Sequence, residues 1–162
     1  MNTPLVAARH LEISFSQWAN RHAVDLLRIS LGIVFFWFGV LKFFPGKSPA
    51  EGLAAQTLHA LSWGLLSEEF SLRFLAAWEC AIGLGLIFRL YLRGTLVLLY
   101  LQMLGTFTPL FLFPALSFAQ APLIPSLEGQ YILKNLVLLS GGLVIAGFDR
   151  GLRPQRASES PI

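Results

Sequence analysis

Residues that carry redox or metal chemistry are scarce in this sequence. It has one cysteine, Cys80, so it can form neither an internal disulfide nor a Cys-x-x-Cys redox pair. Its three histidines all lie outside the long apolar stretches, which excludes a haem ligated by two histidines within them. The sequence also has no metal-ligand cluster, glycine-rich phosphate loop or Ser/His/Asp arrangement. We therefore expect no metal and no intrinsic cofactor.

Charged residues are also few. They make up 13% of the 162 residues, whereas 55% are hydrophobic and 14 residues are phenylalanine. A soluble domain usually has about 25% charged residues, so this composition is typical of a membrane protein. The net charge of +3 does not indicate nucleic acid as a partner, because the basic residues follow a membrane topology instead.

Four apolar stretches are long enough to cross a bilayer. About 20 helical residues span the ~30 Å hydrocarbon layer. The predicted spans are residues 24–44, 70–88, 94–113 and 131–148. We expect an all-α, up-down four-helix bundle in the membrane, with residues 1–162 forming one domain. The first stretch starts late and is too long for a signal peptide, so we expect an uncleaved anchor.

The positive-inside rule orients this bundle. Eight of the twelve basic residues precede or open the first span, lie between spans two and three, or follow the fourth span. The other four are Lys42, Lys47, Arg73 and Lys134. Both termini are therefore predicted to be cytoplasmic. Arg28, with Asp25 three residues earlier, is expected to anchor the first span at the inner boundary.

The segments outside the spans have distinct expected structures. In residues 1–23, Leu11, Phe15 and Trp18 recur at helical spacing, which predicts a short amphipathic surface helix; a frayed terminus is the alternative. Residues 49–66 are amphipathic too, and we expect an interfacial or re-entrant helix between spans one and two.

Two further segments follow later in the chain. The connection between spans three and four contains Pro114, Pro122 and Pro125 and is predicted to be extended and stiff. Residues 154–162 are predicted to form a disordered tail.

Glu79 is the most informative residue because it lies within an apolar span. A carboxylate there must be neutral, paired or exposed to water. Its neighbours on the helix, Ala76, Cys80 and Gly83, are small, which favours a position inside the bundle. Lys42 and Lys134 lie in other spans at depths from which they could pair with it.

The first span has a continuous seam. Arg28, Gly32, Phe35, Gly39 and Lys42 follow at spacings of four, three, four and three residues, so they lie along one side of a helix. Two glycines on that side allow a neighbouring helix to approach closely.

The polar residues of all four spans fall in the outer half of the membrane. Glu79 lies roughly 12 Å and Lys134 roughly 6 Å from the outer ends of their helices. We predict one outer pocket in which Glu79 relays protons and the ligand-binding residues are Lys42, Gln102, Thr106, Lys134 and Asn135. Two alternatives remain: the lysines snorkel into headgroups, or Glu79 forms a structural ion pair. Thr106 has the further alternative of bonding the preceding turn.

Short motifs in the four spans resemble the DoxX-like superfamily of four-helix membrane proteins. The similar stretches are residues 26–43, 78–88, 105–113 and 129–145. The matching positions are Arg28, Gly39, Lys42, Glu79, Gly83, Thr108, Pro109, Gly129 and Lys134. Asn135 stands where relatives often have aspartate. The sequence is most similar to the YkgB-type inner-membrane branch linked to reactive-chlorine resistance.

This resemblance implies a location in the bacterial inner membrane and a role beside membrane oxidoreductases or oxidative-stress enzymes. We expect a subunit or partner of such an enzyme, soluble or membrane-bound, with quinone or another small lipophilic molecule as ligand. Whether the chain is itself an enzyme stays open, as does homo-oligomerisation. A non-enzymatic scaffold or assembly factor is the alternative function, and a small-solute carrier is the third.

Overall fold

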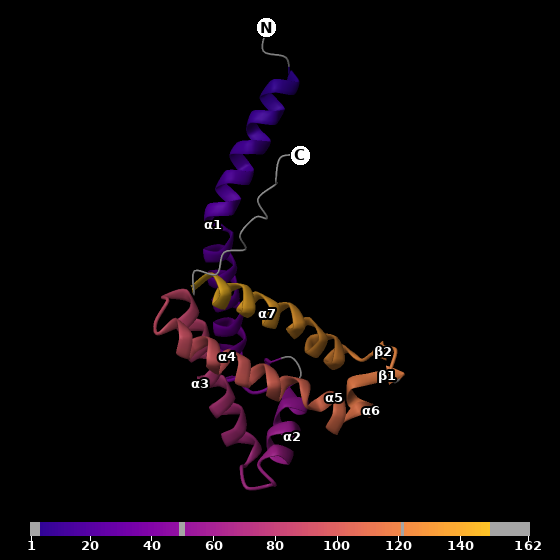
Figure 1. Cartoon of the computed structure of the whole chain (residues 1–162). Helices are drawn as coiled ribbons and strands as arrows, with labels where there is room; N and C mark the ends of the chain where they lie inside the picture. Colours follow the sequence, from indigo (N-terminus) through magenta and orange to yellow (C-terminus); the bar gives the residue numbers. More distant parts are fainter. Residues whose placement is uncertain (1–3, 49–50, 121, 150–162) are drawn as a thin grey trace, which may run out of the picture.

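The chain is mostly helical (Figure 1). The structure, a computed structural model, describes residues 4–48, 51–120 and 122–149; the predicted tail, 154–162, lies outside them. The elements are α1 (Pro4–Leu41), α2 (Glu51–Leu61), α3 (Glu68–Ile87), α4 (Leu92–Phe107), α5 (Pro109–Leu112), α6 (Pro114–Ser117), β1 (Phe118–Gln120), β2 (Ile124–Pro125) and α7 (Leu127–Asp149).

Four helical segments are long and apolar enough to cross a membrane. They are Arg9–Leu41, Glu68–Ile87, Leu92–Leu112 and Leu127–Asp149. The prediction of four long apolar helices is therefore confirmed, and such a set of helices is typical of a multi-pass membrane protein.

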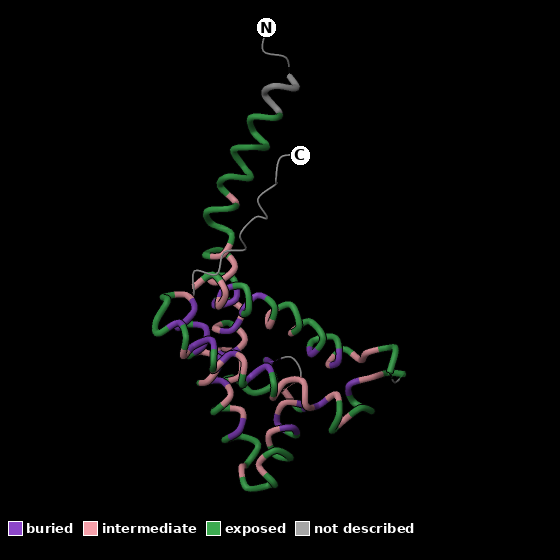
Figure 2. The backbone as a smooth tube through the Cα atoms, viewed as in Figure 1, coloured by how far each residue is buried: buried purple, intermediate pink, exposed green. Residues whose placement is uncertain are grey.

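The N-terminal segment differs from the expectation of a separate surface helix. It continues into the first span as one helix, α1, of 38 residues. Residues 5–31 contain no glycine or proline, so no residue favours a break at the expected boundary near residue 23. The first half of α1 projects from the rest of the molecule, and most of its described side chains are exposed (Figure 2).

The connection after the third span is also more ordered than an extended loop. The helix of the third span is first interrupted at Thr108, between α4 and α5, because Pro109 has no N–H to continue the helical hydrogen bonds. The chain then forms α6 and a small antiparallel hairpin, in which Phe118 pairs with Pro125 and Gln120 with Ile124.

The seam predicted on the first span packs against α3. A Cβ atom on Gly32 would lie 2.9 Å from the Gly83 carbonyl oxygen, and one on Gly39 would lie 2.9 Å from the Cys80 nitrogen. Because there is no room for side chains at these positions, glycine is what allows the two backbones to approach so closely.

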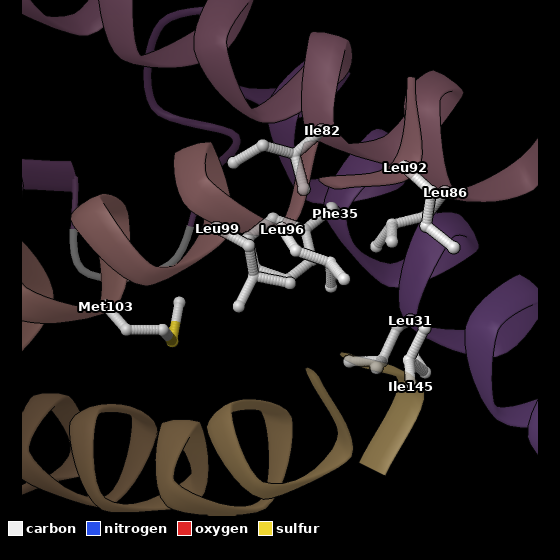
Figure 3. Close-up of a cluster of buried hydrophobic side chains, with 9 residues drawn as sticks. All are labelled: Leu31, Phe35, Ile82, Leu86, Leu92, Leu96, Leu99, Met103 and Ile145. Carbon is white, nitrogen blue, oxygen red and sulfur yellow. The ribbon is translucent and has the colours of Figure 1, made fainter. Parts of the chain in front are cut away.

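The apolar core is shared by α1, α3, α4 and α7 (Figure 3). Each of these helices packs against two of the others: α1 against α3 and α7, and α4 against α3 and α7. The buried core residues are Leu31, Phe35, Ile82, Leu86, Leu92, Leu96, Leu99, Met103 and Ile145. Most lie toward the end of the bundle where α3 is joined to α4, which leaves the opposite end for the polar residues described below.

Arg28 contributes more than the expected anchor beside Asp25. Its Nη1 donates hydrogen bonds to the carbonyl oxygens of Leu86 and Ile87, the latter at 2.9 Å. Its Nη2 lies 3.4 Å from the Asp25 carboxylate. The guanidinium thus caps the C-terminal end of α3, where the helix dipole favours a positive charge.

Replacing Arg28 by methionine should lower the stability of the protein by about 1–3 kcal/mol, since the two partly buried carbonyls would lose a charged donor. The melting temperature of the detergent-solubilised protein measures this effect. Arg21→Met, at an exposed position of the same helix, is the control and should melt like the unmodified protein. Equal melting of both variants would contradict the capping role.

Candidate functional site

Glu79 is buried in the bundle, as its small neighbours indicated. The residue is 7% exposed, and Ala76 and Gly83 on the same side of α3 are buried too. On this side of α3, α1 packs so closely that a Cβ on Gly39 would lie 2.9 Å from the Glu79 Cβ.

Each carboxylate oxygen of Glu79 accepts one hydrogen bond, and the two donors come from different parts of the chain. Lys42, directly after α1, places Nζ 2.7 Å from Oε2. Gln102 of α4 donates from Nε2 to Oε1 at 2.6 Å. We call these three residues the acid cluster. It joins α1, α3 and α4 through one carboxylate, and it satisfies the requirement that a buried charge be paired and hydrogen-bonded.

Only one of the two candidate lysines pairs with Glu79. Lys134, on α7, has an exposed side chain, and its Nζ lies 5.4 Å from the centre of the Tyr131 ring. The idea of an acid held between two lysines is therefore wrong for Lys134. The reason lies in the packing order, since α7 packs mainly on α1 and α4 while Glu79 is on α3.

A cavity of about 690 Å³ lies beside the acid cluster. Its volume falls within the ~300–1,000 Å³ typical of small-molecule sites. All six residues that the sequence singled out line it: Lys42, Glu79, Gln102, Thr106, Lys134 and Asn135. The structure thus brings them to one place, and their roles toward a ligand stay predictions.

The rest of the cavity wall is largely apolar. Phe35 and Phe38 come from α1, Trp78 from α3 and Met103 from α4. One side is formed by α2, the helix predicted between the first two spans, through Leu53, Ala54, Thr57, Leu58 and Leu61. A ligand that fits this wall must be mostly lipophilic.

The remaining polar residues of the cavity differ in their hydrogen-bond partners. The Thr106 hydroxyl donates to the Met103 carbonyl oxygen at 2.9 Å, so the backbone alternative predicted for it is what the structure shows. Gln102 Oε1 is buried and, within the described parts of the chain, has no hydrogen-bond partner. Asn135 is half-buried on the α7 side.

Sequence reasoning missed much of the cavity lining, including one residue of α3 and two of α7. Trp78 lines the cavity and donates from Nε1 to the Leu98 carbonyl oxygen at 3.2 Å, which ties α3 to α4. Tyr131 and Glu128 of α7 also line it. Both precede Lys134 by roughly one or two helical turns, so helical spacing from Lys134 was the available signal for them.

The structure offers no protein-based metal site in residues 4–48, 51–120 and 122–149, where no group of three His, Cys, Asp or Glu side chains is suitably placed. The side chains named above offer hydrogen bonds, charge and a carboxylate that can carry a proton.

These features define a class: a helical protein with four candidate membrane spans and a buried acid cluster beside a lipophilic cavity. No family model matches the sequence, and no curated protein or solved structure matches it either.

Proposed function

We propose that this chain is a DoxX-like inner-membrane protein that serves a membrane oxidoreductase or oxidative-stress system and binds a quinone, or another small lipophilic ligand, in its cavity. The observation that carries the proposal is the position of the acid cluster on the wall of an apolar cavity. Carboxylates are rare within membrane spans, and those that occur there usually mark a substrate or proton pathway.

The proposed arrangement is an up-down bundle with both termini in the cytoplasm. Antiparallel packing is supported by contacts of Arg28 with Ile87 and of Lys42 with Glu79, which run in opposite directions along α1 and α3. A helix of 38 residues is about 57 Å long, well beyond the ~30 Å hydrocarbon layer. The projecting part of α1, with Leu11, Phe15 and Trp18, would therefore lie at or beyond the cytoplasmic interface.

In this proposal each part of the cavity has a role. Lys134 or Asn135 donates a hydrogen bond to a quinone carbonyl. Electrons come from the partner oxidoreductase, and reduction of one quinone to quinol takes up two electrons and two protons. Glu79 passes on protons toward the ligand, while Lys42 and Gln102 hold its carboxylate in place.

Glu79→Gln tests this role. The amide has the shape of the acid and cannot relay protons, so we expect quinone reduction by the partnered system to fall about 100-fold or more. The readout is reduction of a short-chain quinone in vesicles that contain the partner enzyme. Binding of the same quinone to the purified variant, followed by tryptophan fluorescence, shows whether the cavity is intact.

The matched control is Glu69→Gln, because Glu69 forms an exposed pair with Arg73 on the same helix at 2.6 Å. It should leave reduction unchanged. If quinone reduction in the Glu79→Gln variant continues at the unmodified rate, the proton-relay mechanism is wrong.

One observation favours the scaffold as a second candidate. The acid cluster joins three helices in a closed arrangement, which is what a residue that fixes helix packing would do. For the third candidate, the solute carrier, uptake into reconstituted vesicles is the deciding measurement.

A further inference from the structure

Lys134 stands apart among the charged residues of the cavity. Lys42 is neutralised by Glu79 at 2.7 Å. Lys134 also lines the cavity, yet within the described residues no carboxylate lies within 4 Å of its ammonium group. That group lies 5.4 Å from the centre of the Tyr131 ring. It therefore places a positive charge without a carboxylate partner on the rim of an apolar cavity.

The other charge on the cavity wall is Glu128, and it does not neutralise Lys134. The two residues are six positions apart on α7, which is about 9 Å along the helix axis. Glu128 lies in the first turn of α7, where the helix dipole stabilises a negative charge. It also lines a second cavity of about 550 Å³, together with Glu51 and Glu68. Negative charge thus gathers at that end, while the rim at Lys134 is positive.

The shape of the cavity restricts what could complement this charge. Most of the lining is apolar and includes Phe38 of α1, Leu58 of α2 and Trp78 of α3. A volume of about 690 Å³ suits one ligand of drug size, hence one acyl chain rather than two. Asn135, next to Lys134, offers an amide N–H as a second donor for an acidic head group.

We propose that the cavity binds a fatty acid, with the carboxylate on Lys134 and Asn135 and the single acyl chain along the apolar wall. This inference rests on the proposed function only in that the same cavity takes a lipophilic ligand. It specifies the charge of that ligand, because a carboxylate would supply the counter-ion that the protein does not place beside Lys134.

A competition assay on the full-length protein in neutral-lipid nanodiscs tests the proposal. Labelled palmitate is displaced by palmitate, by hexadecanol of the same chain length, or by phosphatidylglycerol. We expect palmitate to bind about tenfold or more tighter than hexadecanol, as for a charge-assisted hydrogen bond. Lys134→Met should reduce this ratio to about one and Lys134→Arg should retain it. Lys47→Met, at an exposed lysine outside the cavity lining, is the matched control and should also retain it.

A second variant guards against misfolding of Lys134→Met. Glu128→Gln removes the carboxylate of the cavity wall that is not paired with Lys42, and it should tighten palmitate binding several-fold without affecting hexadecanol. Equal affinity for palmitate and hexadecanol, a preference that survives Lys134→Met, or no effect of Glu128→Gln would each overturn the proposal. Phosphatidylglycerol competing as well as palmitate would overturn the single-chain occupant.

The same measurements separate this inference from the proposed function. Binding of a short-chain quinone without any preference for palmitate over hexadecanol would refute the fatty-acid site and leave the quinone proposal standing. If neither quinone nor palmitate binds, both proposals fail.

Discussion

Replacing Glu79 by leucine is expected to lower the free energy of unfolding by about 3–5 kcal/mol, because Lys42 would remain as a buried charge without a counter-ion. Gln102 would lose the acceptor of its 2.6 Å hydrogen bond at the same time. The melting temperature and yield of the detergent-solubilised protein measure the loss. This variant differs from Glu79→Gln, which keeps a hydrogen-bond acceptor at the position.

Two further variants make this expectation specific. Glu79→Leu combined with Lys42→Met removes both charges and should recover most of the lost stability, since apolar residues often replace a buried pair without loss. Glu69→Leu breaks an exposed pair and should change stability by less than about 1 kcal/mol. A Glu79→Leu variant that melts like the unmodified protein would contradict the buried pair.

The double variant also separates the two leading functions. A scaffold needs only the packing of its helices, so a stable Glu79→Leu and Lys42→Met protein should still recruit its partner and support function. A proton relay through Glu79 predicts a stable protein without quinone reduction.

Gly83→Ala is expected to have the second large effect, a destabilisation of about 1–3 kcal/mol from overpacking. A Cβ at this position would lie 2.5 Å from the Phe36 backbone nitrogen and 2.7 Å from its Cα. Backbone atoms cannot move aside without separating α1 from α3. Alanine is more favourable than glycine in a helix by only about 1 kcal/mol, so the clash should outweigh this gain and the net change in stability should be a loss. Thermal unfolding in detergent measures it.

Gly147→Ala is the matched control, because nothing lies within 4 Å of a Cβ built there. It should be neutral or stabilise the protein by up to about 1 kcal/mol through helix propensity alone. Comparable melting temperatures for the Gly83 and Gly147 variants would show that α1 and α3 are not packed as closely as described.

Local patterns predicted the helices and the faces on which they pack. Apolar length fixed the four candidate spans, and the spacing of Gly32 and Gly39 indicated the side of α1 that contacts α3. The same reasoning failed at the chain connections. It expected a boundary near residue 23 and an extended loop after residue 113, where the structure has a continuous helix and short ordered elements.

The sequence alone determined that the chain has four long apolar helices, one of them with an acid deep in its span, because helix length and periodicity depend on neighbouring residues. Only the tertiary structure decided that Lys42 pairs with Glu79 and that Lys134 does not. Both lysines lie at suitable depths, so depth could not choose between them. The choice depends on which helices are neighbours and how each is rotated, and these are properties of the packed bundle that no single span encodes.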